Sequence, residues 1–270
     1  MAPLDLQAIP EYSEVPMEAR ISYWIHFALG KHRNEMDFVL HTAKLRRKHD
    51  PSTWRGWNNV MKHNVAQSGA MGALCESMGI DANESERLET YAFVHNPTIC
   101  RDVFRRKQWA DKPIPETERF TAEEEAKLER EYAAIMETVD PDGALRIATS
   151  PEFFDRIAMQ EGETIEEKAM QMPFSDLLVY YVDALFDDGN LLPAHERIAK
   201  MEQRRPDLNA DDARTARLGM RYWDAERKVS TEIQMSVFKW LKTNGIGLAS
   251  PEDVPEFIRK RVGQKMMHAA

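Results

Sequence analysis

The sequence predicts an all-α fold, and three observations favour it. Apolar residues recur at the three- and four-residue spacing of a helical face through most of the chain, as they do in residues 88–95. Almost no stretch shows the strict alternation of a half-buried strand. Helix-ending signals follow several of these faces, for example Gly79. We therefore expect one helical domain over residues 17–270, preceded by an irregular arm over residues 1–16.

The composition limits the classes of partner. The chain has 270 residues, of which 43% are hydrophobic and 30% charged, as expected for a globular protein with a sizeable core. A net charge of -9 argues against nucleic acid or an anionic membrane as the main partner. No apolar run approaches the roughly 18–20 residues that span a bilayer, and the start lacks the pattern of a signal peptide. Two cysteines, Cys75 and Cys100, suit a reducing compartment, so we expect a cytoplasmic protein.

The apolar pattern gives the helices of the first half in order. Two helices are expected between residues 17 and 45, where Gly30 interrupts the apolar stripe. The next helix carries His63 and ends at Gly79. A short helix over residues 88–96 should end there because the following Pro97 has no N–H. After a proline-containing linker, Thr121 and Glu124 form a capping box that opens an amphipathic helix reaching Val139.

The second half contains further helical segments. The expected ranges are 152–160, 164–170, 174–186, a helix around Ile198 and Met201, 213–241 and 254–262. The turn Asp187-Asp-Gly-Asn190 should end the helix over residues 174–186.

Three titratable side chains lie on otherwise apolar helical faces. His63 shares a face with Gln67, Met71 and Leu74, and His95 shares one with Leu88, Tyr91 and Ala92. Asp183 lies among Leu178, Val179, Val182 and Phe186, where an ionised carboxylate is costly unless a cation or several donors compensate it. A lone core histidine is usually satisfied by one hydrogen bond, so each residue also has a purely structural interpretation.

Three pieces of sequence resemble the HD superfamily of helical metal-dependent phosphohydrolases. Residues 63–81 run from His-Asn to Gly-Ile-Asp, similar to the helix with the first histidine of the family. Tyr91-Ala-Phe-Val-His-Asn96 is similar to the helix that ends in Leu-Leu-His-Asp. Residues 177–185, followed by His195-Glu-Arg197, resemble the helix of the last aspartate and the Glu-Arg after it. Together the pieces cover an HD-like core over about residues 60–201, to which N- and C-terminal helices are added.

The resemblance implies a metal-dependent phosphohydrolase acting on a nucleotide or another small phosphoester. His63, His95 and Asp183 would bind a divalent transition metal, which imidazole and carboxylate ligands restrict to Mn, Fe, Co, Ni or Zn. Asn96 replaces the aspartate of the family pattern and would orient water or substrate beside Asp183. Because an amide is a poorer ligand and takes up no proton, we expect a mononuclear or impaired site.

The role of the basic run and two other interpretations of the whole chain remain open. Arg101 and Arg105, in a basic run after His95, are candidate ligands of a substrate phosphate, although such a run is more often a solvated surface. Asn96 also fits a catalytically inactive HD-like scaffold that binds a ligand or a partner protein, in which the three side chains form a hydrogen-bonded cluster without metal. A plain α-helical protein with an accidental resemblance is the third interpretation.

Overall fold

The computed structural model describes residues 54–105, scattered residues of 121–137, and residues 150–269 apart from 158, 160–161 and 188–189. The arm over residues 1–16, the helices expected between residues 17 and 45, and the proline-containing linker lie outside the described residues. For residues 54–65 and 94–105 the structure describes the backbone and not the side chains.

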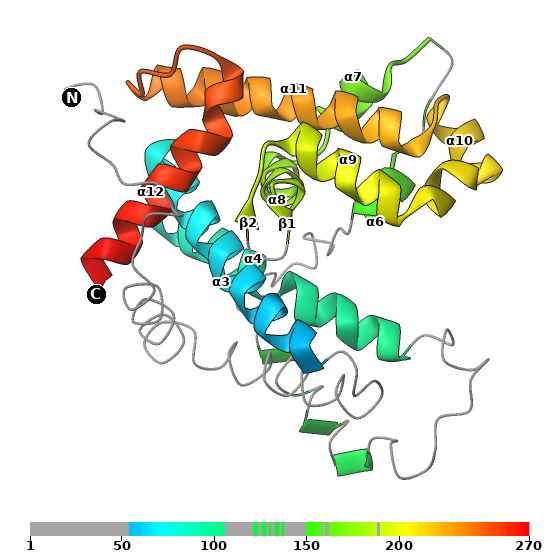
Figure 1. Cartoon of the computed structure of the whole chain (residues 1–270), viewed down its shortest axis with the longest axis horizontal. Coiled ribbons are helices and arrows are strands. Elements are labelled where there is room, and N and C mark those ends of the chain that lie inside the picture. Colours follow the sequence, from blue (N-terminus) through cyan, green and yellow to red (C-terminus); the bar gives the residue numbers. More distant parts are fainter. Residues whose placement is uncertain are drawn as a thin grey trace.

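Helices dominate the described residues, as the sequence predicts (Figure 1). The α-helices are α3 (Trp54–Ser77), α4 (Ala82–Arg105), α6 (Ser150–Asp155), α7 (Ile165–Ala169), α8 (Phe174–Ala184), α9 (Ala194–Arg204), α10 (Asp212–Leu218), α11 (Tyr222–Thr243) and α12 (Val254–Ala269). Two short 3-10 helices, η7 (Pro206–Ala210) and η8 (Pro251–Asp253), precede α10 and α12. Within these residues no helix is both long and apolar enough to cross a membrane.

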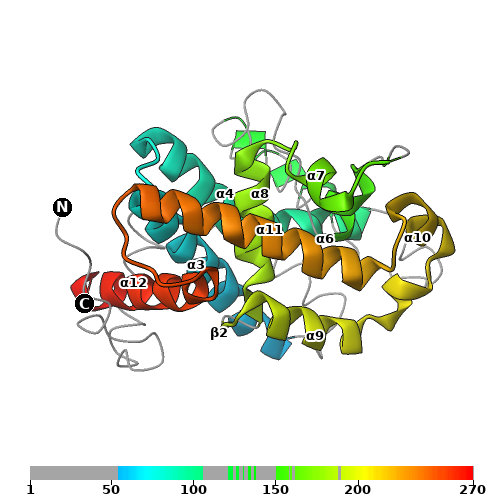
Figure 2. The same cartoon turned by 90° about the horizontal axis from the view of Figure 1, so that it is seen from above.

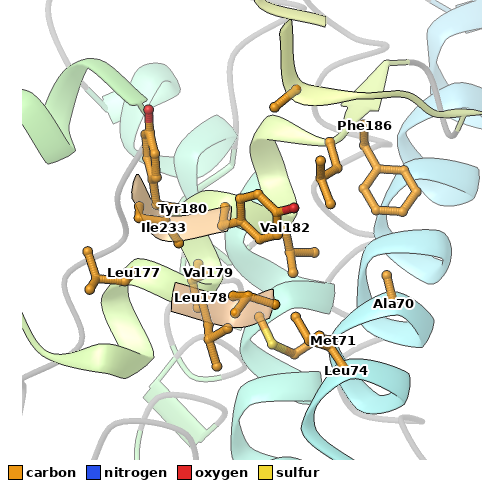
Figure 3. Close-up of a cluster of buried hydrophobic side chains, with 14 of the residues drawn as sticks. Ala70, Met71, Leu74, Leu177, Leu178, Val179, Tyr180, Val182, Phe186 and Ile233 are labelled. Carbon is orange, nitrogen blue, oxygen red and sulfur yellow. The ribbon is translucent and has the colours of Figure 1, made fainter. Parts of the chain in front are cut away.

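Helix α8 lies at the centre of the described core. It packs against α3 and α4 on one side, and α11 crosses it on another (Figure 2). Its residues Leu178, Val179 and Val182 gather with Met71 and Leu74 of α3 in a cluster of buried side chains (Figure 3). These five side chains are at most 4% exposed, so the face of α8 that packs against α3 is fully buried. The terminal helix α12 packs along α3 and closes the domain.

Pro97 does not end its helix, and that prediction was wrong. Helix α4 begins at Ala82 and continues through Pro97 to Arg105, so residues 88–96 lie inside a 24-residue helix. A proline inside a helix removes one intrahelical hydrogen bond at a cost of about 3 kcal/mol. The packing of α4 against α3 and α8 offsets such a local loss, which local sequence rules do not include.

Other boundaries also differ from the predicted ones, and the helix expected over residues 152–160 is the shorter α6, which ends at Asp155. The single helix expected over residues 213–241 is two, because Gly219 adopts φ 67° and ends α10. Helix α8 ends at Ala184 instead of Phe186, which forms a two-residue strand β1 (Phe186–Asp187) paired antiparallel with β2 (Asn190–Leu191). The terminal helix extends past residue 262 to Ala269.

The helix predicted after Thr121 is described only in part. Residues 122–123, 126–127, 130, 133–134 and 137 are helical and exposed. They confirm that a helix lies in this range. The apolar residues Leu128, Tyr132, Ile135 and Met136 lie outside the described residues.

Candidate metal centre

The two helices that carry the histidine positions form an antiparallel hairpin with a short, well-capped turn. Gly79 (φ 67°) ends α3 in a Schellman motif, in which the N–H of Gly79 bonds to the carbonyl of Glu76 and the N–H of Ile80 to that of Cys75. Asp81 then caps α4, since its Oδ1 accepts a hydrogen bond from the N–H of Asn83 at 2.9 Å. The Gly-Ile-Asp81 end of the first motif therefore specifies the turn between the helices.

Contacts along the hairpin define its register. The hydroxyl of Ser68 donates to the backbone carbonyl of Glu89 at 2.7 Å. Near it, a Cβ built on Gly72 would lie 2.7 Å from Glu89 Oε2, so the two helices approach closely here. From this contact, position 63 is five residues back along α3 and position 95 is six residues forward along α4. At about 1.5 Å per residue on antiparallel helices, the two backbone positions are nearly level.

Both predicted histidine faces are buried where the structure describes them. On α3, Gln67, Ala70, Met71 and Leu74 are each 0% exposed. On α4, Leu88, Tyr91 and Ala92 are at most 2% exposed. Helix α8 packs on both α3 and α4, so these faces lie within one core. The side chains of His63, His95 and Asn96 themselves lie outside the described residues.

Asp183 is the predicted site residue whose side chain the structure describes. It lies near the end of α8, partly buried, and its Oδ1 accepts a hydrogen bond from Gln67 Nε2 at 2.7 Å. Gln67 follows position 63 by one helical turn on the same face of α3. The contact therefore brings the aspartate of the third motif next to the helix of the first motif.

The role of Gln67 is not apparent from the sequence, although its spacing predicts that it shares a helical face with His63. The available signal was an amide among Ala70, Met71 and Leu74, because a fully buried amide requires a polar partner. Only the fold shows that Asp183, 116 positions later, is that partner.

The predicted phosphate ligands Arg101 and Arg105 lie on α4, and their side chains are outside the described residues. Position 101 is about 9 Å beyond position 95 along the helix axis, and position 105 is about 15 Å beyond it.

Arg197, in the Glu-Arg pair that follows the third motif, has a structural partner. Its Nε donates to the backbone carbonyl of Phe186 at 3.1 Å, which ties α9 to strand β1 just after Asp183. On the same strand, Asp187 pairs with Arg204 at 2.6 Å. Burial acts to raise the pKa of Asp187, but the hydrogen bonds and charges of Arg204 and Lys200 together outweigh burial, and the pKa is lowered.

A second buried polar group, which the sequence analysis did not identify, joins α8 to α11. Tyr180 is 1% exposed, and its hydroxyl lies 3.3 Å from Ser230 Oγ and hydrogen-bonds to Glu226. Burial, together with the negative charge of Glu226, raises the pKa of Tyr180 well above its ordinary value. The network connects two core helices and so has a structural role.

A cavity of about 430 Å³ opens at the turn end of the hairpin. It is lined by Gly72, Ile80 and the acidic residues Glu76, Glu86 and Glu89. Because Gly72 is nine residues after position 63, about 14 Å along α3 towards the turn, this cavity is separate from the predicted site. Within the described part of the chain, no group of three or more histidine, cysteine, aspartate or glutamate side chains is arranged to bind a metal ion.

Comparison with known proteins identifies no relative, because no family model, no curated protein and no solved structure matches this chain.

Proposed function

We propose that this chain is an HD-type helical protein whose divalent-metal site hydrolyses a nucleotide or another small phosphoester. The observation that supports this proposal is the mutual packing of α3, α4 and α8, the helices that carry positions 63, 95 and 183. The hydrogen bond from Gln67 to Asp183 links the first and last of them one turn from position 63. Two ligands of one metal must also lie at a similar height along their helices. The register of the hairpin supports this for positions 63 and 95.

In the proposed site, His63, His95 and Asp183 hold the metal. When bound, a divalent transition metal polarises the phosphoester and activates a water molecule. Asp183 supplies the negative charge of the ligand set, and Gln67 holds one of its oxygens in place. Asn96 can donate and accept hydrogen bonds but takes up no proton, so it orients a substrate or water. Arg101 and Arg105 are the candidate donors to the phosphate.

The same hydrogen bond favours a second candidate function, a metal-free scaffold that binds a ligand or a partner protein. Gln67 gives Asp183 a donor within the protein, which offsets part of the cost of burying the carboxylate without a cation. Asn96 in place of the aspartate of the family pattern is consistent with this alternative.

Metal content tests the proposal directly. Purified wild-type protein, the His95→Ala variant and a His195→Ala control are incubated with Mn²⁺ or Zn²⁺, desalted and measured by elemental analysis. His195 is an exposed histidine on α9 and is not among the proposed ligands, so its replacement should leave the metal content unchanged. About one metal per chain in wild type and its loss in His95→Ala support the site. Equal metal in all three proteins, or none in any, contradicts it.

The Asn96→Asp variant separates the two functions. Wild type and variant are assayed on phosphodiesters and nucleotides with Mn²⁺, Co²⁺ or Zn²⁺. Hydrolysis by wild type excludes the inactive scaffold. Hydrolysis by Asn96→Asp alone indicates a ligand site disabled by the amide, because the carboxylate restores both charge and proton acceptance.

A further inference from the structure

Gln67 is a fully buried polar side chain on α3. It is 0% exposed and lies on the face of α3 that also carries Ala70, Met71 and Leu74, each 0% exposed. An amide at such a position is costly unless its polar atoms are paired. The nitrogen is paired, since Nε2 donates to Asp183 Oδ1 at 2.7 Å.

The oxygen of the same amide has no such partner. Within the described part of the chain, no donor forms a hydrogen bond with the buried Gln67 Oε1. The carboxylate fixes the orientation of the amide, because the reverse orientation would place two acceptor oxygens against each other. Since both atoms belong to one small planar group, the unpaired oxygen stays beside Asp183.

An unpaired buried acceptor has a cost of about 1–3 kcal/mol, which a donor arriving with a ligand would remove. Asp183 is only partly buried, so a ligand can reach this end of α8 from solvent. A carboxylate with a neighbouring amide oxygen forms an oxygen-rich surface, which suits a hydrated cation. A neutral apolar ligand would leave the amide oxygen unpaired.

We propose that Gln67 is a positioning residue of the Asp183 site: its amide N–H holds Asp183 Oδ1, and its buried Oε1 accepts a hydrogen bond from the hydration water of a divalent cation bound at Asp183. This inference rests on the proposed function, because it requires a cation at Asp183. It adds to the site a residue that is not among the predicted ligands. The unpaired oxygen then has a partner in the loaded protein.

The test compares Mn²⁺ binding by full-length wild type, Gln67→Met and the control Gln234→Met, using calorimetry and the electron paramagnetic resonance signal of free Mn²⁺. Methionine keeps the length of the side chain and removes both polar atoms. Gln234 is a matched control, because it also bonds to an α8 residue, accepting from the Tyr181 hydroxyl at 3.0 Å. Tyr181 and Asp183 are two positions apart and so project from different faces of α8.

We expect Gln67→Met to weaken Mn²⁺ binding about 10- to 100-fold and Gln234→Met to leave it unchanged. Folded Gln67→Met protein that binds Mn²⁺ as tightly as wild type overturns the inference and leaves the proposed function standing. Wild type that binds neither Mn²⁺ nor Zn²⁺ overturns the proposed function, and this inference with it.

A second variant covers the case in which Gln67→Met does not fold. Gln67→Glu places two carboxylates side by side, a repulsion that a divalent cation relieves. Saturating Mn²⁺ should therefore raise the melting temperature of Gln67→Glu more than that of wild type. A purely structural tether predicts destabilisation without this rescue, and equal Mn²⁺ shifts in the two proteins would contradict the positioning role.

Discussion

The stability of the metal-free protein should depend on the Gln67–Asp183 hydrogen bond in a way that a double-mutant cycle can measure. The bond is 2.7 Å long, and hydrogen bonds to charged groups contribute about 1.5–3 kcal/mol. Asp183→Ala removes the acceptor and leaves both polar atoms of the fully buried Gln67 unpaired. We therefore expect this variant to lower the free energy of unfolding by about 1.5–3 kcal/mol.

The other two members of the cycle should behave differently. Gln67→Met leaves the carboxylate of Asp183 partly exposed to water, so we expect a smaller loss of about 1 kcal/mol. The double variant should be no less stable than Asp183→Ala, because no amide remains unpaired. The resulting coupling energy is at least about 1 kcal/mol.

The assay is urea unfolding followed by circular dichroism, with a chelator present in every sample. Gln67→Met combined with Gln234→Met is the control pair, and its effects should add within about 0.5 kcal/mol. A Gln67–Asp183 coupling below about 0.5 kcal/mol would show that the hydrogen bond does not link α3 to α8 in solution, and would remove the main support for a site shared by these helices.

Three further predictions concern the fold around the site. Burial raises the pKa of Tyr181 well above its ordinary value, so above about pH 10 the folded chain retains a proton that the unfolded chain loses. For this residue, the free energy of unfolding should therefore fall by about 1.4 kcal/mol per pH unit above about pH 10. Tyr181→Phe should reduce this dependence on pH when urea unfolding is measured at pH 9–11. Gly79→Ala should lower the free energy of unfolding in urea by about 1–2 kcal/mol, because φ is 67° at this position and the new Cβ would lie 3.0 Å from Asn244 Oδ1. An unchanged unfolding midpoint would contradict the assigned turn. Arg204 and Lys200 lower the pKa of Asp187 against the effect of burial, so the ionised carboxylate stabilises the fold above about pH 4, and this stabilisation is lost as the pH falls further. The stability of Asp187→Asn should therefore depend less on pH than that of wild type in an acid titration followed by circular dichroism.

The sequence predicted the helical faces well because periodicity is a local property. The apolar face of α3 and its glycine stop could be recognised without a structure, and so could the buried face of Leu88, Tyr91 and Ala92. The same local rules also located α7, whose capping box joins Thr164 to Glu167.

The misplaced boundaries have tertiary or conformational causes. Pro97 is a strong stop signal in an isolated peptide, yet α4 continues through it as part of a helix that packs against α3 and α8. Gly219 ends α10 through a left-handed conformation, whereas the apolar spacing continues across it. The Phe186–Leu191 strand pairing is too short to produce an alternating pattern.

The sequence indicates which helices carry the candidate site, but it does not indicate which polar side chains form hydrogen bonds there. Gln67 and Asp183 are separated by 116 positions, so no pattern in the chain indicates that they pair. The buried Glu226 is a similar case, because its partner Tyr180 comes from another helix. Pairing between distant polar residues depends on how helices pack, which periodicity does not specify.

The charge of the proposed ligand set determines which cations it can hold. Replacing the aspartate of the family pattern by Asn96 leaves Asp183 as the single carboxylate among the four positions. Gln67 Nε2 already donates a hydrogen bond to the Asp183 carboxylate and stabilises the negative charge of that carboxylate within the protein. Most of the affinity must then come from the imidazoles of His63 and His95, and imidazole favours transition metals over Mg²⁺ and Ca²⁺. Because one carboxylate cannot readily bridge two cations and Asn96 adds no charge, the ligand set suits a single transition-metal ion better than a metal pair.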